Sequence, residues 1–94
     1  MNQLQIFNHP MFGELPVMIV EGVEWFGGVE AAKALSFSDP HKAITNHVDE
    51  DDSTVHPVID SLGRKQNKKF INESGLYSLI FGAAKQGNNP EIKE

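Results

Sequence analysis

The first quarter of the chain alternates short apolar runs with turn-forming residues, a pattern typical of short β-strands. Residues 17–20 are apolar at every position, which predicts an interior strand with both faces covered. Glu21-Gly22 then provides a two-residue turn into a further strand, in which Trp25 and Phe26 must point to opposite faces. We therefore expect strands at about 3–8, 15–20 and 23–26.

Two short helices are predicted next. The first carries Ala31, Ala32 and Leu35 on one side, and Asp39-Pro40 then supplies a capping side chain and a proline suited to a first helical turn. Helices joined by about three residues form a helix-turn-helix-like pair, although such pairs also occur in many domains that never contact DNA. The expected ranges are about 28–36 and 40–48, and the outward face of the second helix carries polar side chains of the types that reach base edges: His41, Lys42, Thr45 and Asn46.

The second half of the chain predicts a β-hairpin that leads into a core helix. Residues 54–60 alternate around Pro57, which favours an edge strand or a bulge, and turn residues surround Gly63. Asn72 is a good N-cap for a helix with a broad apolar face, which we expect to fill the core: Leu76, Tyr77, Leu79, Ile80, Ala83 and Ala84. The expected ranges are strands at about 53–60 and 68–72 and a helix at about 73–85.

These elements predict one small α+β domain over residues 1–94, with a mainly antiparallel sheet, a helix pair and a β-hairpin followed by a core helix. Its hydrophobic content of 39% is ordinary for a globular fold. The sequence has no cysteine, which excludes disulfides and thiolate metal sites, and no apolar run approaches the roughly 20 residues of a membrane-spanning helix. We therefore expect a domain without membrane association that works in a reducing cytoplasm.

Charge is distributed unevenly in this chain, whose net charge is −5. Residues 61–69 carry four basic side chains and no acid, so the other 85 residues together carry −9. The four cations are predicted to lie on the tip and the return strand of the hairpin: Arg64, Lys65, Lys68 and Lys69. Such a cluster indicates either one basic contact face, as in nucleic-acid-binding domains, or a solvated hairpin tip.

Other candidate chemistry is weak. Residues 49–52 are all acidic, but this run lacks the alternating spacing and the central glycine of a calcium loop, and we interpret it as a solvated loop. The four histidines share no ligand spacing, and His47, on an apolar helix face, is interpreted as a hydrogen-bonded core residue. The sequence has no nucleophile motif and no phosphate-binding loop. We expect no metal, no cofactor and no enzymatic activity.

Residues 70–80, Phe-Ile-Asn-Glu-Ser-Gly-Leu-Tyr-Ser-Leu-Ile, resemble the signature of the Bro-N domain. That domain stands at the N-terminus of baculovirus repeated-ORF proteins and of many prophage antirepressors. The likeness covers about residues 14–86 in the family's order and includes three further segments: Trp25-Phe26 with 30–35, Pro40 with Ala43-Ile44 and His47-Val48, and 59–63.

The chain departs from the family pattern at two places. Gly27-Gly28 stand where the family usually has an apolar and a basic residue, which removes a side chain suited to a phosphate. Ser36 stands where a glycine normally ends the first helix, and a left-handed backbone there would cost on the order of 1 kcal/mol.

In the family a further helix begins near the position of Asn89-Pro90. We therefore expect either a domain truncated before its final helix or one that completes its core as a homodimer. In a homodimer, a second copy would cover the apolar face of helix 73–85 formed by Leu76, Leu79 and Ile80, or the sheet beside it.

The resemblance implies a phage or prophage antirepressor-type transcription regulator of the bacterial host cytoplasm. In one interpretation the domain binds DNA through the basic hairpin, helped by the outward face of the second helix. In the alternative it is a protein–protein interaction module that binds and inactivates a phage repressor. The basic and polar residues assigned to nucleic-acid binding are Arg64, Lys65, Lys68, Lys69, Lys42, Asn46, Thr45 and His41.

Overall fold

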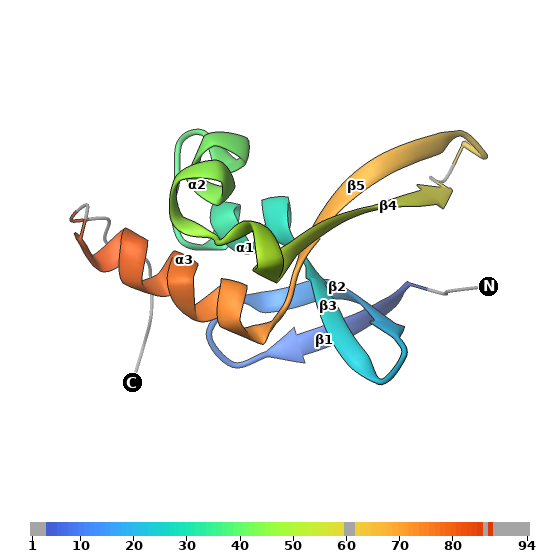
Figure 1. The fold of residues 1–94 in the computed structure, drawn as a ribbon, viewed down its shortest axis with the longest axis horizontal. Helices are drawn as coiled ribbons and strands as arrows, with labels where there is room; N and C mark the ends of the chain where they lie inside the picture. The colour runs from blue at the N-terminus through green and yellow to red at the C-terminus, as the bar shows by residue number, and fades with distance from the viewer. Residues whose placement is uncertain (1–3, 60–61, 86, 88–94) are drawn as a thin grey trace.

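The computed structural model describes residues 4–59, 62–85 and 87. Figure 1 shows three α-helices gathered at one end of a five-stranded antiparallel sheet, whose strands extend toward the other end, and so confirms the predicted α+β class. The elements in chain order are β1 (Gln5–His9), β2 (Gly13–Val20), β3 (Val23–Gly27), α1 (Gly28–Ala34), α2 (Pro40–His47), the 3₁₀ turn η1 (Glu50–Asp52), β4 (Ser53–Ile59), β5 (Lys65–Ile71) and α3 (Glu73–Lys85).

The sheet has the strand order β1-β2-β3-β5-β4 and consists of two parts joined by a short seam. Strands β1, β2 and β3 form a meander, and β4 and β5 form a hairpin with seven paired positions. Among the described residues, only Phe26↔Ile71 and Gly27↔Phe70 pair β3 with β5. The two parts diverge from this seam, so the β4–β5 hairpin projects from the domain as an arm (Figure 1).

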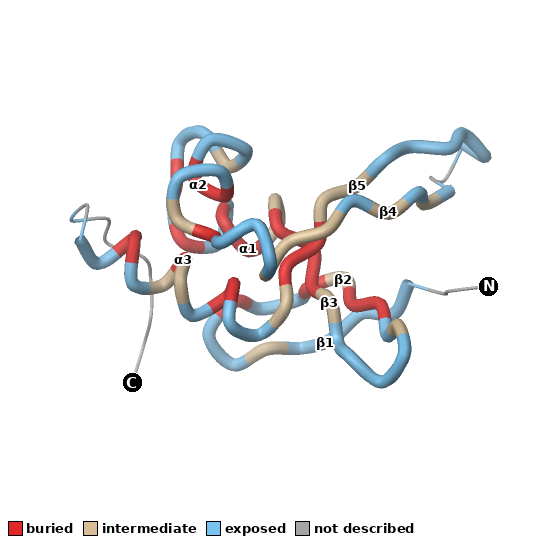
Figure 2. Tube along the Cα trace, viewed as in Figure 1, coloured by how far each residue is buried: buried red, intermediate tan, exposed pale blue. Residues whose placement is uncertain are grey.

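The main hydrophobic core lies between one face of the sheet and the three helices (Figure 2). Strand alternation puts Leu15 and Val17 on this face, and Phe26 and Ile71 continue it across the seam. The helices and their connections contribute small and branched side chains: Ala31, Ala32, Leu35, Ala43, Ile44, Leu76, Leu79 and Ala83.

Local signals correctly predicted several turns and caps. Glu21 and Gly22 have φ values of 51° and 80°, as expected for a two-residue hairpin turn. Pro57 lies on the edge strand β4 as predicted. The helix Glu73–Lys85 confirms the predicted range 73–85, and Asn72 caps it, because its Oδ1 accepts a hydrogen bond from the backbone N of Gly75 at 2.9 Å.

The return strand β5 begins at Lys65 and not at residue 68 as predicted. Its first three residues are polar and give no apolar alternation, but β4 offers a continuous row of backbone groups with which they pair. Helix α1 ends at Ala34, earlier than predicted, so the connection to α2 has five residues, 35–39, and not about three.

Ser36 has a φ of 67° and occupies the left-handed position that usually belongs to glycine. Its backbone N donates to the carbonyl of Lys33 at 3.0 Å, and the backbone N of Phe37 donates to the carbonyl of Ala32 at 3.2 Å. These two bonds form a Schellman motif at the end of α1, and the buried Phe37 closes it against the core. The strain anticipated for a serine at this position is therefore present.

Helix α3 is turned differently from the prediction. Tyr77 was expected in the core but is 64% exposed, and Phe81 is 68% exposed. The inner face instead includes Gly75 and Gly82, where the helix backbone packs closely: a Cβ on Gly82 would meet the ring of His47 at 2.6 Å. Leu76 and Leu79 are buried within this chain and are thus not open to a second copy.

One residue of the acidic run before β4 has a structural role that the sequence did not predict. Asp52 was interpreted as part of a solvated loop, but its Oδ1 accepts a hydrogen bond from Asn72 Nδ2 at 3.1 Å. The backbone N of Asn72 also donates to the carbonyl of Asp52 at 3.0 Å. This pair fixes the start of α3 against the start of β4. The Asn89-Pro90 segment, where the final helix of the family pattern begins and before which truncation was expected, lies outside the described residues.

Candidate nucleic-acid interface

The β4–β5 hairpin, which we call the basic arm, is the most distinctive surface of the domain. At about 3.4 Å per residue, seven paired residues make a ribbon roughly 20 Å long. The five residues of β5 from Lys65 to Lys69 pair only with β4 among the described residues, since the seam with β3 involves positions 70 and 71. A two-stranded ribbon of this kind fits the major groove of DNA, which is about 12 Å wide.

The four basic residues predicted to bind nucleic acid all lie along this arm, but in different settings. Arg64 and Lys65 are exposed near its far end, at the start of β5. Lys68 and Lys69 are half-buried near its root. Strand alternation puts Lys65 and Lys69 on one face and Lys68 on the other. Within the described residues, neither Lys65 nor Lys69 forms an ion pair.

Lys68 is tied to the body of the domain. Its Nζ donates a hydrogen bond to Glu30 Oε2 in the first turn of α1, and the two side chains are 23% and 38% exposed. The other carboxylate oxygen, Glu30 Oε1, is buried and has no hydrogen-bond partner among the described residues. The positive charge of Lys68 is therefore compensated inside the domain, and we place it apart from the other three cations.

The outward face of α2 is exposed as predicted, but it lies away from the basic arm. The four polar residues predicted there are all exposed, and the face is ordered by Thr45 Oγ1, which donates to the carbonyl of His41 at 3.1 Å. Asp39 Oδ1 caps the helix by accepting from the backbone N of Lys42 at 3.2 Å. Lys42 and Asn46 line a hollow of about 510 Å³ beside the α1–α2 turn. Figure 1 shows α2 at the helical end of the domain and the basic arm at the other end, so the structure does not merge these two predicted groups into one patch.

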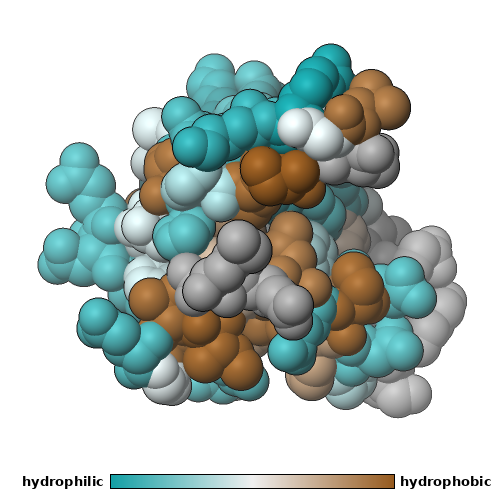
Figure 3. Space-filling model, turned by 90° about the vertical axis from the view of Figure 1, so that its right-hand side faces the viewer, coloured by the Kyte–Doolittle hydropathy of each residue, from teal (hydrophilic) through white to brown (hydrophobic). Residues whose placement is uncertain are grey.

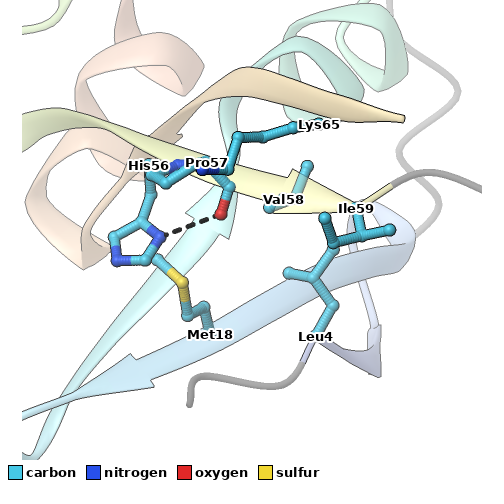
Figure 4. A pocket seen from close by; sticks show the side chains of 7 residues that line it. All are labelled: Leu4, Met18, His56, Pro57, Val58, Ile59 and Lys65. Carbon is cyan, nitrogen blue, oxygen red and sulfur yellow. Dashed lines mark hydrogen bonds between the residues drawn. The ribbon is translucent and has the colours of Figure 1, made fainter. Parts of the chain in front are cut away.

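An apolar cleft opens where the basic arm and the β1–β2–β3 meander diverge (Figure 4). Met18 forms part of its wall from the meander, and Val58 and Ile59 line it from the arm. His56 and Lys65 supply polar groups, and His56 Nδ1 lies 3.2 Å from the carbonyl oxygen of Pro57. The volume of the cleft is about 450 Å³. Our sequence reasoning missed this cleft, because it depends on the angle between the two parts of the sheet.

The arm also carries exposed apolar side chains. Leu62 is 73% exposed, and Val55 and Ile59 are exposed as well. Figure 3, which looks toward the ends of the strands, shows apolar side chains in several areas among polar ones on this face. The alternation of residues 54–60 predicted a strand here, but it did not predict that Val55 and Ile59 would remain exposed.

The remaining candidate chemistry has structural explanations. The ring of His47 packs against that of Phe37, with centroids 5.5 Å apart, between α2 and α3. The described residues contain no group of three or more histidine, aspartate or glutamate side chains placed to hold a metal ion. In the described part of the chain, no helix has the length and apolar character needed to cross a membrane.

Comparisons with known proteins agree with the pattern of residues around α3. The family model described as BRO family, N-terminal domain, matches residues 14–91. An uncharacterized protein of Haemophilus influenzae (strain ATCC 51907 / DSM 11121 / KW20 / Rd) is 30% identical over 92 residues. The alignment covers 95% of this chain but 45% of that protein, so the chain spans less than half the length of this relative. No solved structure matches the chain.

Proposed function

Because the chain belongs to the BRO family, whose N-terminal domain it matches over residues 14–91, we propose that it is a DNA-binding domain of an antirepressor-type phage or prophage regulator. It acts in the cytoplasm of the bacterial host. The observation that carries this proposal is the basic arm, a ribbon that projects from an otherwise acidic chain and concentrates half of its eight lysine and arginine residues. An acidic chain repels DNA, so a contact requires a basic element held away from the acids.

The arm supports a contact made chiefly with the phosphate backbone. Lys65 at its far end and Lys69 nearer its root provide two cations that no carboxylate within the described residues neutralises by an ion pair, and Arg64 adds a third, exposed cation beside Lys65. Each cation that reaches a phosphate contributes about −0.9 to the slope of log K against log salt. A slope near −2.7 is therefore expected for three contacts and near −3.6 if Lys68 also leaves Glu30 to join them.

Sequence preference, in this proposal, comes from α2. Lys42 and Asn46 are exposed and carry the donors and acceptors that read base edges, with Thr45 and His41 beside them. Because α2 lies away from the basic arm, its contribution depends on how the duplex passes over the domain. Replacing Lys42 or Asn46 is expected to change which sequence is preferred, while changes in the arm weaken binding to every sequence.

Fluorescence anisotropy with a labelled mixed-sequence duplex of about 30 bp tests this proposal. Binding is measured in steps of salt between about 50 and 200 mM, the range over which several phosphate contacts cause a large loss of affinity. The expected result is binding with a log–log slope between about −2.7 and −3.6. Absence of binding at the lowest salt and at high micromolar protein, or a slope near zero, would overturn the proposal.

A second function is favoured by a separate observation, the apolar surface of the arm. Leu62 and Ile59 are exposed on the arm, Ile59 also lines the apolar cleft, and such surfaces are typical of protein-binding sites. In this alternative the domain binds and inactivates a phage repressor through the arm and the cleft. Binding would then depend weakly on salt, and replacing Leu62 and Ile59 by serine would weaken it while leaving any DNA binding unchanged.

A further inference from the structure

The two edge strands of the sheet differ in how well they resist pairing with another chain. The edge strand β4 contains Pro57, which has no N–H to offer. It is preceded by the acidic residues 49–52 and followed in the sequence by Asp60, so antiparallel self-pairing of β4 would bring like charges together. The opposite edge strand, β1, contains no proline and no charged residue. It lacks the devices that usually protect an edge.

The charge pattern indicates which partner suits β1. Residues 1–13 contain no Asp, Glu, Lys or Arg, in a chain whose net charge is −5. Two acidic copies repel one another over most of their surfaces, but the residues of this edge contribute no like charges to that repulsion. Ile6 on β1 is 66% exposed and Phe7 is also exposed, so the edge carries apolar side chains that a second strand would cover.

The backbone of β1 sets the register of such a pair. The turn at Glu21-Gly22 is closed by a backbone hydrogen bond between Val20 and Val23. Because bonded pairs alternate along an antiparallel ladder, β2 turns the backbone groups of its odd-numbered residues toward β1. Ile6 and Asn8 of β1 then have outward N–H and C=O groups. In a symmetric antiparallel pair, Ile6 would exchange bonds with Asn8 of the second copy, and Phe7 would lie opposite Phe7.

Pairing of the β1 edges would also bring the exposed face of α3 close to the second copy. A two-fold axis through paired edge strands runs perpendicular to the sheet, so the helices of both copies lie on the same face of the enlarged sheet. The exposed side chains Tyr77 and Phe81 of α3 belong to that layer. A hollow of about 270 Å³, lined by Phe7, Met11, Tyr77 and Ile80 among others, joins β1 to α3. Edge and helix thus form one mainly apolar surface, interrupted by Glu24 and Glu73 in this hollow, that is larger than strand pairing alone provides.

We propose that the chain forms a homodimer in which the β1 strands of two copies pair in antiparallel fashion and the outer faces of the two α3 helices lie beside each other. This interface differs from the one expected from the sequence, because Leu76 and Leu79 are already buried within one copy. It does not depend on DNA binding, so it can be tested independently of the proposed function.

Sedimentation velocity over a range of protein concentrations tests the dimer. The chain has a mass of 10.4 kDa, and the wild type is expected to sediment with twice that mass. Ile6→Lys is expected to raise the dissociation constant of the dimer at least about tenfold, because it puts a charge on each side of a covered edge. Val55→Lys is the matched control, since Val55 is 53% exposed on the other edge strand, and it is expected to leave the dimer unchanged.

Cysteine cross-linking tests the register, which is feasible because the chain has no native cysteine. Phe7→Cys is expected to give a disulfide-linked dimer in a glutathione buffer, whereas Ile19→Cys, exposed on β2, is not. If circular dichroism shows that Phe7→Cys does not fold, the double variant Ile6→Cys/Asn8→Cys tests the same register. A monomer at all concentrations up to about 1 mM, loss of the dimer in Val55→Lys but not Ile6→Lys, or cross-linking at Ile19 alone would overturn the proposal.

Discussion

Lys68 of β5 donates a hydrogen bond to Glu30 of α1, a residue 38 positions earlier in the chain. The contact ties the root of the basic arm to the first turn of a helix, where a carboxylate is also favoured by the helix dipole. It sets Lys68, whose charge is compensated by Glu30, apart from the other three basic residues of the arm. The DNA-binding proposal therefore gives different expected salt slopes for variants of Lys68 and of the other basic residues.

Replacing Lys68 should mainly affect stability, whereas replacing Lys69 should mainly affect the salt slope of DNA binding. Lys68→Met is expected to lower the free energy of unfolding by about 1 kcal/mol, because it leaves the partly buried Glu30 carboxylate without its cation. It should change the salt slope of DNA binding little. Lys69→Met is expected to leave stability within about 0.5 kcal/mol and to reduce the slope by about 0.9. Urea unfolding and salt-dependent anisotropy measure both quantities, and equal slope changes in the two variants would contradict this assignment.

The double variant Arg64→Ala/Lys65→Ala should weaken DNA binding for all sequences alike. Two lost phosphate contacts reduce the slope by about 1.8, so the loss of affinity becomes smaller as salt rises. Stability should change by less than about 0.5 kcal/mol, since both residues are exposed. The charge-matched control is Lys33→Ala/Lys85→Ala, which removes two exposed lysines from α1 and α3. If this control weakens binding as much as the arm variant does, net charge and not the arm is responsible.

Ser36→Gly should stabilise the domain. Ser36 has a φ of 67°, so glycine at this position removes backbone strain at the end of α1, which we expect to raise the free energy of unfolding by about 1 kcal/mol. Ser36→Ala keeps the strain and serves as the control, with an expected change within about 0.5 kcal/mol. Both are measured by urea unfolding. An equal gain in the two variants would mean that the serine side chain, and not the backbone, is unfavourable.

Gly82→Ala should destabilise the domain although alanine is the better helix former. The new Cβ would meet the His47 ring at 2.6 Å, and forcing the two elements apart typically costs about 1–3 kcal/mol. The same substitution in a His47→Ala background should cost less, because the ring is gone. A double-mutant cycle by urea unfolding measures this coupling. Additive effects would show that Gly82 and His47 do not limit how closely α2 and α3 approach.

Features governed by neighbouring residues could be predicted from the sequence. The Glu21-Gly22 turn, the cap at Asn72 and the position of Pro57 on an edge strand each depend on the chemistry of one short segment. The left-handed backbone at Ser36 was also anticipated, because the resemblance placed a glycine there.

Features governed by pairs of distant residues could not be predicted. The start of β5 at Lys65 depends on the backbone of β4, and the direction of Tyr77 depends on the close packing of Gly82 against α2. The ion pair between Lys68 and Glu30 joins two segments 38 residues apart, and nothing in the sequence indicates that one cation of the basic segment 61–69 meets this glutamate. For the candidate site, the sequence thus identified the basic segment but not that Lys68 is held by Glu30.

The strand order of the sheet carries a consequence for the spacing of a DNA target. If two copies pair through β1, the enlarged sheet reads β4-β5-β3-β2-β1-β1-β2-β3-β5-β4, and seven inter-strand steps separate its two β5 strands. At about 4.8 Å per step the separation is about 34 Å, close to one helical turn of B-DNA. This is the separation of the arm roots at residues 70 and 71, and because the two-fold axis points the two basic arms in opposite directions, the matching operator would be an inverted repeat with half-site centres at least about 10 bp apart. The number of strands in the sheet, and not the length of a loop, would set this spacing.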